Sequence, residues 1–137
     1  MLAKWFFVAL LLSPGILHAD DVPDCGLYTY SAEIVRVIDG DTVVADIDLG
    51  FNTWLHDEHL RLNGIDAPEK GTPDAQTATA VLSERVEGRT VYICTIKMAR
   101  SEREKRGSFG RYLAVIYEGG ANINEWLLSE GYVAPYK

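Results

Sequence analysis

Two runs of β-forming residues meet at Asp39 and Gly40, a dipeptide that favours a tight hairpin turn. Residues 28–38, before the turn, are rich in Tyr, Val and Ile. After the turn apolar and acidic residues alternate, with Val43, Ala45, Ile47 and Leu49 on one parity and Asp46 and Asp48 on the other. This alternation predicts a half-buried strand. We therefore expect the folded domain to begin with an antiparallel strand pair.

A third strand is predicted around Leu60 and Leu62. Arg61 lies between these two leucines, so its side chain is expected to point away from the apolar face. Residues 50–58, which include Trp54, are predicted to form a turn region.

Two helices follow, each with recognisable ends. Thr72 and Pro73 are typical of an N-cap and a first helical residue, and Gly88 of a helix end. Asn122 begins a second helix with the spacing of a capping box, and Gly131 ends it.

Residues 90–96 and 112–117 predict two more strands, so the order is three strands, helix, two strands, helix. Hydrophobic residues make up 47% of the chain, which is enough for a packed core. The expected fold is mainly β with helices: a five-stranded Greek-key barrel of the OB-fold type plus two short helices.

The N-terminus has the pattern of a signal peptide. Lys4 precedes an apolar run over residues 5–12, which is too short to span a bilayer, and the segment ends at Ala19. We expect cleavage after Ala19, export to the periplasm or medium, and a folded domain over residues 20–137. An uncleaved anchor is the alternative.

The chain has two cysteines, Cys25 and Cys94. In an exported chain such a pair favours a disulfide. The alternative is two unpaired thiols, one of them buried in a strand.

Acidic residues dominate the predicted mature chain, which has 12 basic against 20 acidic side chains, a net charge of −8. Six basic residues lie within residues 97–111: Lys97, Arg100, Arg103, Lys105, Arg106 and Arg111. A polyanionic partner would therefore meet a local basic rim on an acidic body. A solvated loop is the simpler interpretation.

Three clusters contain the residues suited to catalysis: residues 38–42 (Ile-Asp-Gly-Asp-Thr), residues 61–69 (Arg-Leu-Asn-Gly-Ile-Asp-Ala-Pro-Glu) and residues 109–111 (Phe-Gly-Arg). Each cluster alone reads as an ordinary turn or strand start. Together, the carboxylates of Asp41, Asp66 and Glu69 are ligands suited to a hard cation such as calcium. Arg61 and Arg111 can each grip a phosphate through two hydrogen bonds. A metal beside two arginines suits phosphodiester cleavage.

In this order the three clusters resemble the staphylococcal nuclease family, over about residues 32–133. The resemblance implies that Asp41 and Asp66 bind Ca²⁺ through their carboxylates and Ala67 through its backbone carbonyl. The best-known member has threonine at the position of Ala67, but the carbonyl contact needs no particular side chain. Glu69 is expected to activate the attacking water, and Asp39 to orient the metal ligands without binding the metal.

The resemblance also assigns Arg61 and Arg111 to the phosphate and its transition state. Ser108 and Phe109 replace a lysine–tyrosine pair that helps to bind nucleotide in the best-known member, so substrate grip is expected to differ. The family's last helix is also expected to be missing. Tyr132 and Tyr136 are candidates for lining a base pocket.

The expected function is therefore that of a calcium-dependent nuclease, an endonuclease that hydrolyses phosphodiester bonds of DNA, RNA or both. We expect a monomer with nucleic acid as its substrate and no stable membrane association after signal cleavage. A catalytically inactive OB-fold module that binds nucleic acid or protein is one alternative, and a calcium-stabilised structural domain is another. The complete set of Asp41, Arg61, Asp66, Glu69 and Arg111 favours the enzyme.

Overall fold

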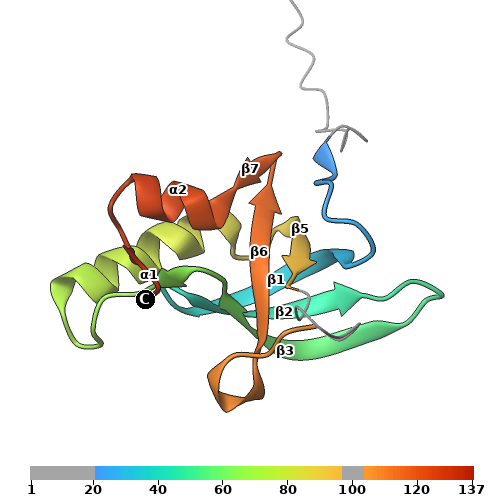
Figure 1. The fold of residues 1–137 in the computed structure, drawn as a ribbon, viewed down its shortest axis with the longest axis horizontal. Coiled ribbons are helices and arrows are strands. Elements are labelled where there is room, and N and C mark those ends of the chain that lie inside the picture. The colour runs from blue at the N-terminus through green and yellow to red at the C-terminus, as the bar shows by residue number, and fades with distance from the viewer. Residues whose placement is uncertain (1–20, 97–103) are drawn as a thin grey trace, which may run out of the picture.

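The computed structural model describes residues 21–96 and 104–137. The predicted signal peptide lies outside these residues, as do Lys97, Arg100 and Arg103 of the basic segment. Figure 1 shows a curled sheet with two helices on one side of it.

The strands and helices come in the order predicted. The main strands are β1 (Thr29–Asp39), β2 (Thr42–Asp48), β3 (Trp54–Leu62), β5 (Thr90–Thr95) and β6 (Tyr112–Glu118). The helices are α1 (Pro73–Val86) and α2 (Ile123–Ser129). Short elements complete the chain: β4 (Ile65–Asp66), a 3₁₀ turn (Ser108–Gly110), β7 (Ala121–Asn122) and β8 (Ala134–Pro135).

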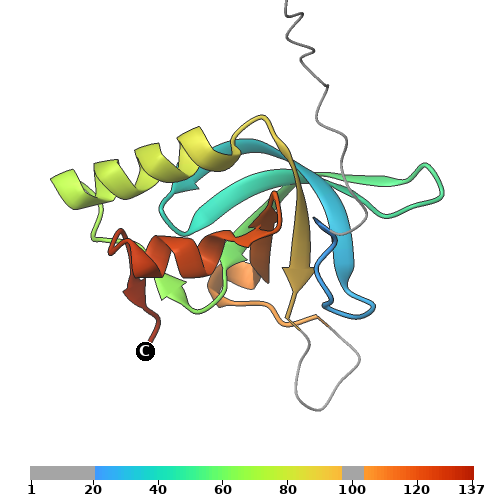
Figure 2. The ribbon, with the colours of Figure 1, turned by 90° about the horizontal axis from the view of Figure 1, so that it is seen from above.

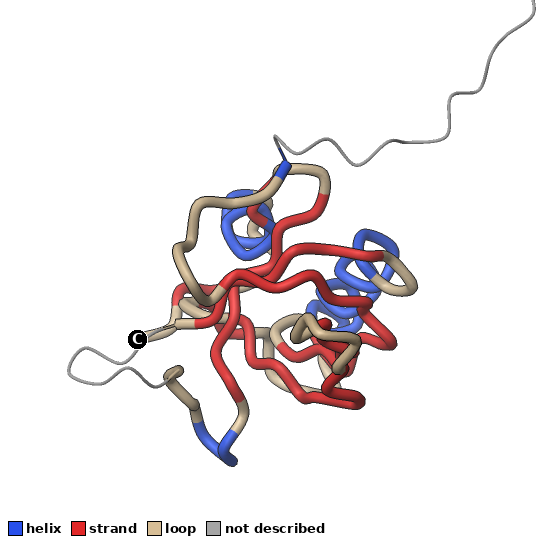
Figure 3. Tube along the Cα trace, turned by 90° about the vertical axis from the view of Figure 1, so that its right-hand side faces the viewer, coloured by secondary structure: helices blue, strands red, loops and turns tan. Residues whose placement is uncertain are grey.

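The five main strands form a closed barrel, which confirms the expected fold. Neighbouring strands pair in the order β3-β2-β1-β5-β6, and β7 continues the sheet beyond β6. A further pairing between β3 and β6 closes the barrel, and it is parallel, whereas the other strand pairs described are antiparallel. In Figure 3 the strands occupy the middle of the molecule and the helical segments lie around them.

The predicted turn over residues 50–58 is wrong for its second half, because β3 already begins at Trp54. Trp54 pairs with Asp48 and Leu55 with Ile47, so β2 and β3 extend as a hairpin away from the barrel. Residues 54–57 are exposed on both faces, which removes the alternation that marks a strand. The hairpin is also interrupted at Asp57, which has a positive φ of 54°.

Both predicted helix starts are confirmed. The Thr72 side chain accepts a hydrogen bond from the Ala75 N–H at 3.2 Å, and Asn122 does the same for Glu125 at 3.1 Å. The buried face of α1 presents Ala78, Leu82 and Val86 to the barrel. Among the described residues, no helix has both the length and the apolar character needed to cross a membrane.

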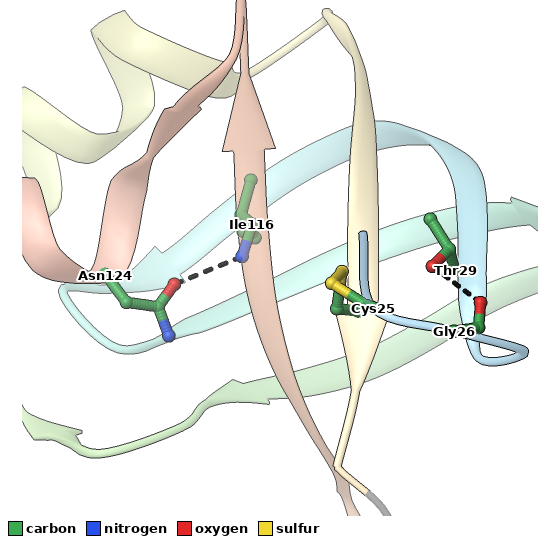
Figure 4. The surroundings of a disulfide bond; sticks show 6 residues. Cys25, Gly26, Thr29, Ile116 and Asn124 are labelled. Carbon is green, nitrogen blue, oxygen red and sulfur yellow. Dashed lines mark hydrogen bonds between the residues drawn. A yellow bond between two sulfur atoms is a disulfide. The ribbon is translucent and has the colours of Figure 1, made fainter. Parts of the chain in front are cut away.

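A disulfide joins Cys25 to Cys94, as predicted. The two Cα atoms lie 5.9 Å apart, within the range that a disulfide requires. Cys94 belongs to β5, whose residues pair with the start of β1. The bond therefore attaches the segment before β1 to the barrel wall, as Figure 4 shows.

Candidate functional site

Three chain segments meet at one end of the barrel: the β1–β2 turn, the residues that follow β3, and the segment before β6. The parallel pairing of Leu60 with Tyr112 and of Arg61 with Leu113 brings the last two together. They enclose a cleft of about 420 Å³. Its lining includes Asp39, Asp41, Arg61, Leu62, Gly64, Ile65, Asp66, Lys70, Phe109, Arg111 and Tyr136.

The Arg61 guanidinium lies between two carboxylates. Its Nη2 is 3.2 Å from Asp41 Oδ2 and 3.0 Å from Asp66 Oδ1. Its Nη1 donates to the backbone carbonyls of Leu62, at 3.0 Å, and Ile65, at 2.8 Å. The side chain is only 13% exposed. Arg61 thus stays out of the apolar core, as its position between two leucines predicts, and its orientation is fixed by four contacts.

Asp41 is the most buried acid of the cleft, with 11% of its side chain exposed. Its Oδ2 accepts the Ala67 N–H at 2.7 Å, and its Oδ1 accepts the Thr42 hydroxyl at 2.9 Å. Asp66 differs, because 57% of its side chain is exposed. The pair therefore consists of one fixed carboxylate and one that faces solvent.

Gly40 explains how the β1–β2 turn reaches this position. A Cβ atom at Gly40 would lie 2.8 Å from the Cβ of Ala78 in α1 and 3.3 Å from the Cβ of Ala67. A distance of 2.8 Å is too short for two carbon atoms, so only glycine allows the turn to approach α1 this closely. The close approach places Asp41 beside the loop that contains Ala67.

Arg111 reaches the cleft from the opposite side. Its Nη1 donates to the Thr42 hydroxyl at 3.2 Å, so Thr42 links Arg111 to Asp41. The Phe109 ring lies 5.5 Å from the Arg111 guanidinium, and the Tyr136 ring lies 5.9 Å from that of Arg61. Each arginine therefore has an exposed aromatic ring beside it, at a distance that allows cation–π attraction.

Asp39 lies next to Asp41, and its Oδ1 accepts the Asp41 N–H at 3.0 Å. Burial and the neighbouring Asp41 carboxylate raise the pKa of Asp39 above its ordinary value, although hydrogen bonds from Asp41 N–H and Thr42 oppose the shift. This end of the barrel therefore favours a compensating positive charge.

Glu69 is the one predicted catalytic residue that does not line the cleft. Its side chain is exposed, whereas the next residue, Lys70, does line the cleft. The backbone carbonyl of Glu69 accepts hydrogen bonds from Thr72, at 2.7 Å from the hydroxyl and 3.3 Å from the N–H. The start of α1 therefore anchors the loop that bears Glu69.

The two tyrosines predicted as candidates for a base pocket line different hollows. Tyr136 lines the cleft, because β8 pairs with β4 and returns the chain to Arg61. Tyr132 instead packs on Trp126 with 5.8 Å between ring centroids, and it faces a different hollow.

Sequence reasoning missed Asn124, a buried residue of α2 that holds the site together. Its Nδ2 donates to the carbonyls of Asn63, at 3.0 Å, and Ala114, at 3.1 Å. Its Oδ1 accepts the Ile116 N–H at 3.2 Å, which Figure 4 shows. Asn124 thereby ties the turn between β3 and β4 to β6. Its place after the N-cap is the only signal in the sequence, and that signal predicts a helix start rather than a buried bridge.

Comparison with known proteins gives a consistent result. The family model described as staphylococcal nuclease homologue matches residues 59–137, a range that includes Arg61 and Arg111 but begins after Asp41. A thermonuclease of Staphylococcus intermedius is 34% identical over 100 residues, which cover 72% of this chain and 55% of the relative.

Two other relatives are similar over more of the chain. An uncharacterized endonuclease of Haemophilus influenzae is 28% identical over 134 residues, which cover 98% of this chain and 65% of the relative. An uncharacterized protein of Methanocaldococcus jannaschii is 29% identical over 133 residues, and the match covers 78% of this chain and 59% of the relative. The chain thus spans between 55% and 65% of the length of these three relatives.

Proposed function

Because the chain belongs to the staphylococcal nuclease homologue family, we propose that it is a nuclease that hydrolyses phosphodiester bonds of DNA, RNA or both. The observation that carries the proposal is the convergence of Arg61, Asp41, Asp66 and Arg111 on one cleft. Two guanidiniums at one end of a barrel suit a phosphate, whose negative charge grows during cleavage.

Calcium is the proposed cofactor, and the available donors fit it. The carboxylates of Asp41 and Asp66 both contact Nη2 of Arg61, so they lie close to each other. The Ala67 backbone lies next to both residues, since Ala67 directly follows Asp66 in the chain and its N–H donates to Asp41. These oxygen donors are the kind that calcium prefers. Among the described residues, no three His, Cys, Asp or Glu side chains lie close enough together to hold a metal ion by themselves. The Ala67 carbonyl and water would therefore complete the ligand set.

The two arginines are proposed to bind the scissile phosphate. The two backbone contacts of Arg61 Nη1 hold its guanidinium at the cleft before substrate arrives, which reduces the entropy lost on binding. The phosphate would replace the carboxylates at Nη2 when Asp41 and Asp66 bind calcium. Arg111 approaches through Thr42 from the other side, so the phosphate would lie between two positive charges. When bound, calcium would add Lewis-acid polarisation of the phosphate oxygens.

Glu69 is proposed as the general base. Its carboxylate takes a proton from a water molecule, the water oxygen attacks phosphorus, and the bond from phosphorus to the leaving oxygen breaks. The leaving oxygen gains a proton from solvent. Glu69 is exposed on a short loop next to Lys70, so a side-chain rotation toward the cleft is part of this proposal.

Export of the protein is also proposed. The N-terminal pattern of Lys4, an apolar run and Ala19 supports it. The disulfide between Cys25 and Cys94 gives independent support, because such bonds persist in oxidising compartments.

The direct test incubates residues 20–137 with single-stranded DNA and with RNA, in calcium and in excess chelator. We expect cleavage with calcium and almost none with chelator. Full activity in chelator would contradict the metal assignment, and binding without cleavage in calcium would identify an inactive module.

Glu69→Gln should lower turnover roughly 100-fold, the usual scale for loss of an acid–base group. A folded Glu69→Gln protein with normal turnover would remove Glu69 from the mechanism.

A further inference from the structure

A second hollow, of about 610 Å³, lies beside the cleft; we name it the α1 groove. Its walls are residues 37–40 at the end of β1, the loop at residues 67–71, and one side of α1. Figure 2 shows the β1–β2 turn running beside α1. The groove exists because its walls are built largely from small side chains, among them Gly40, Ala67, Ala75 and Ala80.

The α1 groove is continuous with the cleft. Asp39 and Lys70 line both hollows, so they stand at the junction. Lys70 is exposed and is the single cation lining the groove within the part of the chain described. A strand with one phosphate between Arg61 and Arg111 would therefore meet Lys70 at the point where it leaves the cleft.

The lining of the α1 groove suits a nucleoside better than a second phosphate. Ile38 is 38% exposed and gives the groove an apolar surface on which a base can stack. Gln76 adds an exposed amide that can both donate and accept hydrogen bonds. The volume is within the range of sites that hold a ligand of this size.

The α1 groove differs in charge from a third hollow, which also borders the cleft at Asp66. On the far side of the loop at residues 67–71 lies this hollow, of about 410 Å³. Two carboxylates, Asp66 and Asp74, line that hollow, and its described lining contains no lysine or arginine. A polyanion leaving the cleft meets only acidic side chains among the charged residues there, whereas in the α1 groove Lys70 offsets Asp39, the one carboxylate in the described lining.

We propose that in a single-stranded substrate Lys70 contacts the phosphate next to the cleaved one, and that the α1 groove binds the nucleoside beyond this second phosphate. This inference rests on the proposed nuclease function and assigns the path of its substrate. It predicts that an oligonucleotide, which reaches the groove, is cleaved more efficiently than a dinucleotide that is too short to fill it.

The test uses three exposed positions on α1. Gln76→Glu and Ala80→Glu each place a negative charge in the groove, whereas Thr77→Glu places the same charge on the side of the helix that faces the other hollow. For each variant, kcat/KM is measured with a single-stranded oligonucleotide and with a dinucleotide. We expect the ratio of the oligonucleotide kcat/KM to the dinucleotide kcat/KM to fall about tenfold in Gln76→Glu and Ala80→Glu, the scale of one repulsive contact near a protein surface. Thr77→Glu should retain the ratio of the parent protein.

Binding of a fluorescent oligonucleotide in a Glu69→Gln background provides a readout that needs no turnover. We expect weaker binding in the two groove variants and unchanged binding in Thr77→Glu. Equal behaviour of all three variants in either assay would overturn the groove assignment. Failure of the parent protein to cleave any substrate would overturn the proposed function instead, and the binding comparison would still decide the groove.

Discussion

Thr42 connects the two sides of the cleft, because its hydroxyl donates to Asp41 and accepts from Arg111. Replacement by valine keeps the shape of this buried side chain and removes both hydrogen bonds. We expect Thr42→Val to lower kcat roughly tenfold, since hydrogen bonds to charged groups are worth more than neutral ones.

Thr53→Val is the matched control, because Thr53 lies in the turn at the far end of the β2–β3 hairpin. Steady-state kinetics and melting curves of both variants make the comparison. Normal turnover in a folded Thr42→Val protein would show that Arg111 needs no link to Asp41.

Gly40 and Ala78 form a close contact that can be tested by mutual substitution. Gly40→Ala forces two methyl carbons together and should destabilise the protein by about 1–3 kcal/mol, the usual cost of overpacking. Ala78→Gly in the same chain removes the clash, although glycine in a helix costs about 1 kcal/mol itself.

The double variant should therefore be more stable than Gly40→Ala alone. Urea unfolding of the four proteins in this cycle measures the coupling between the two sites. If the stability changes of the two single variants simply add in the double variant, the β1–β2 turn can move away from α1 without a cost in stability.

At the scale of elements, Glu87 ties the end of α1 to β1. Its Oε2 accepts the Val37 N–H at 3.0 Å and the Ser83 hydroxyl at 2.9 Å. These bonds, the Val37 bond first, lower the pKa of Glu87 below its ordinary value. A lowered pKa stabilises the fold above the unfolded-state pKa, and this contribution is lost as the pH falls through the folded-state value.

Glu87→Gln is thus expected to be less stable than the parent protein at pH 7, with a difference that disappears once the pH falls well below about 4.3, the unfolded-state value for glutamate. The free energy of unfolding in urea, measured across this range, provides the comparison. Glu84→Gln, an exposed change of the same kind on α1, is the control. A difference that persists at low pH would trace the effect to lost packing rather than to charge.

Elements differ in how far their sequence determines them. Thr72, Pro73 and Asn122 act within one helical turn, so the two helix starts can be predicted from local sequence. The first half of β3 cannot, because its residues are exposed on both faces and the pattern of burial is absent.

The candidate site lies between these extremes. The motifs identify Asp41, Arg61, Asp66 and Arg111 as residue types suited to the chemistry, and the fold brings these four to one cleft. The hydrogen bonds made by Thr42 and Asn124 depend on which strands pair. Lys70 lines the cleft because of the path that the loop at residues 67–71 takes. Strand pairing and loop course are long-range properties that local patterns do not encode.

At the scale of the whole molecule, the disulfide joins the segment before β1 to the fourth strand of the barrel. The loop it closes has a sequence separation of 69 residues, so reduction should cost about 4 kcal/mol in the chain-entropy model. We expect a lower melting temperature in reductant. A variant with both Cys25 and Cys94 replaced by serine should show the lower temperature with or without reductant, and an unchanged melting temperature of the reduced parent would contradict the prediction.

The parallel pairing of β3 with β6 has a consequence for folding kinetics. Arg61 lies within this pairing and Arg111 immediately before it, so the two guanidiniums meet only after the barrel has closed. Closure joins segments far apart in the chain, and contacts of this kind form slowly because their loop entropy is lost before they are stabilised. A refolding chain that has already formed its helices and the β1–β2 hairpin would therefore still lack the proposed phosphate site. In a refolding time course, the return of phosphate binding should coincide with the last cooperative step, however early the secondary structure returns.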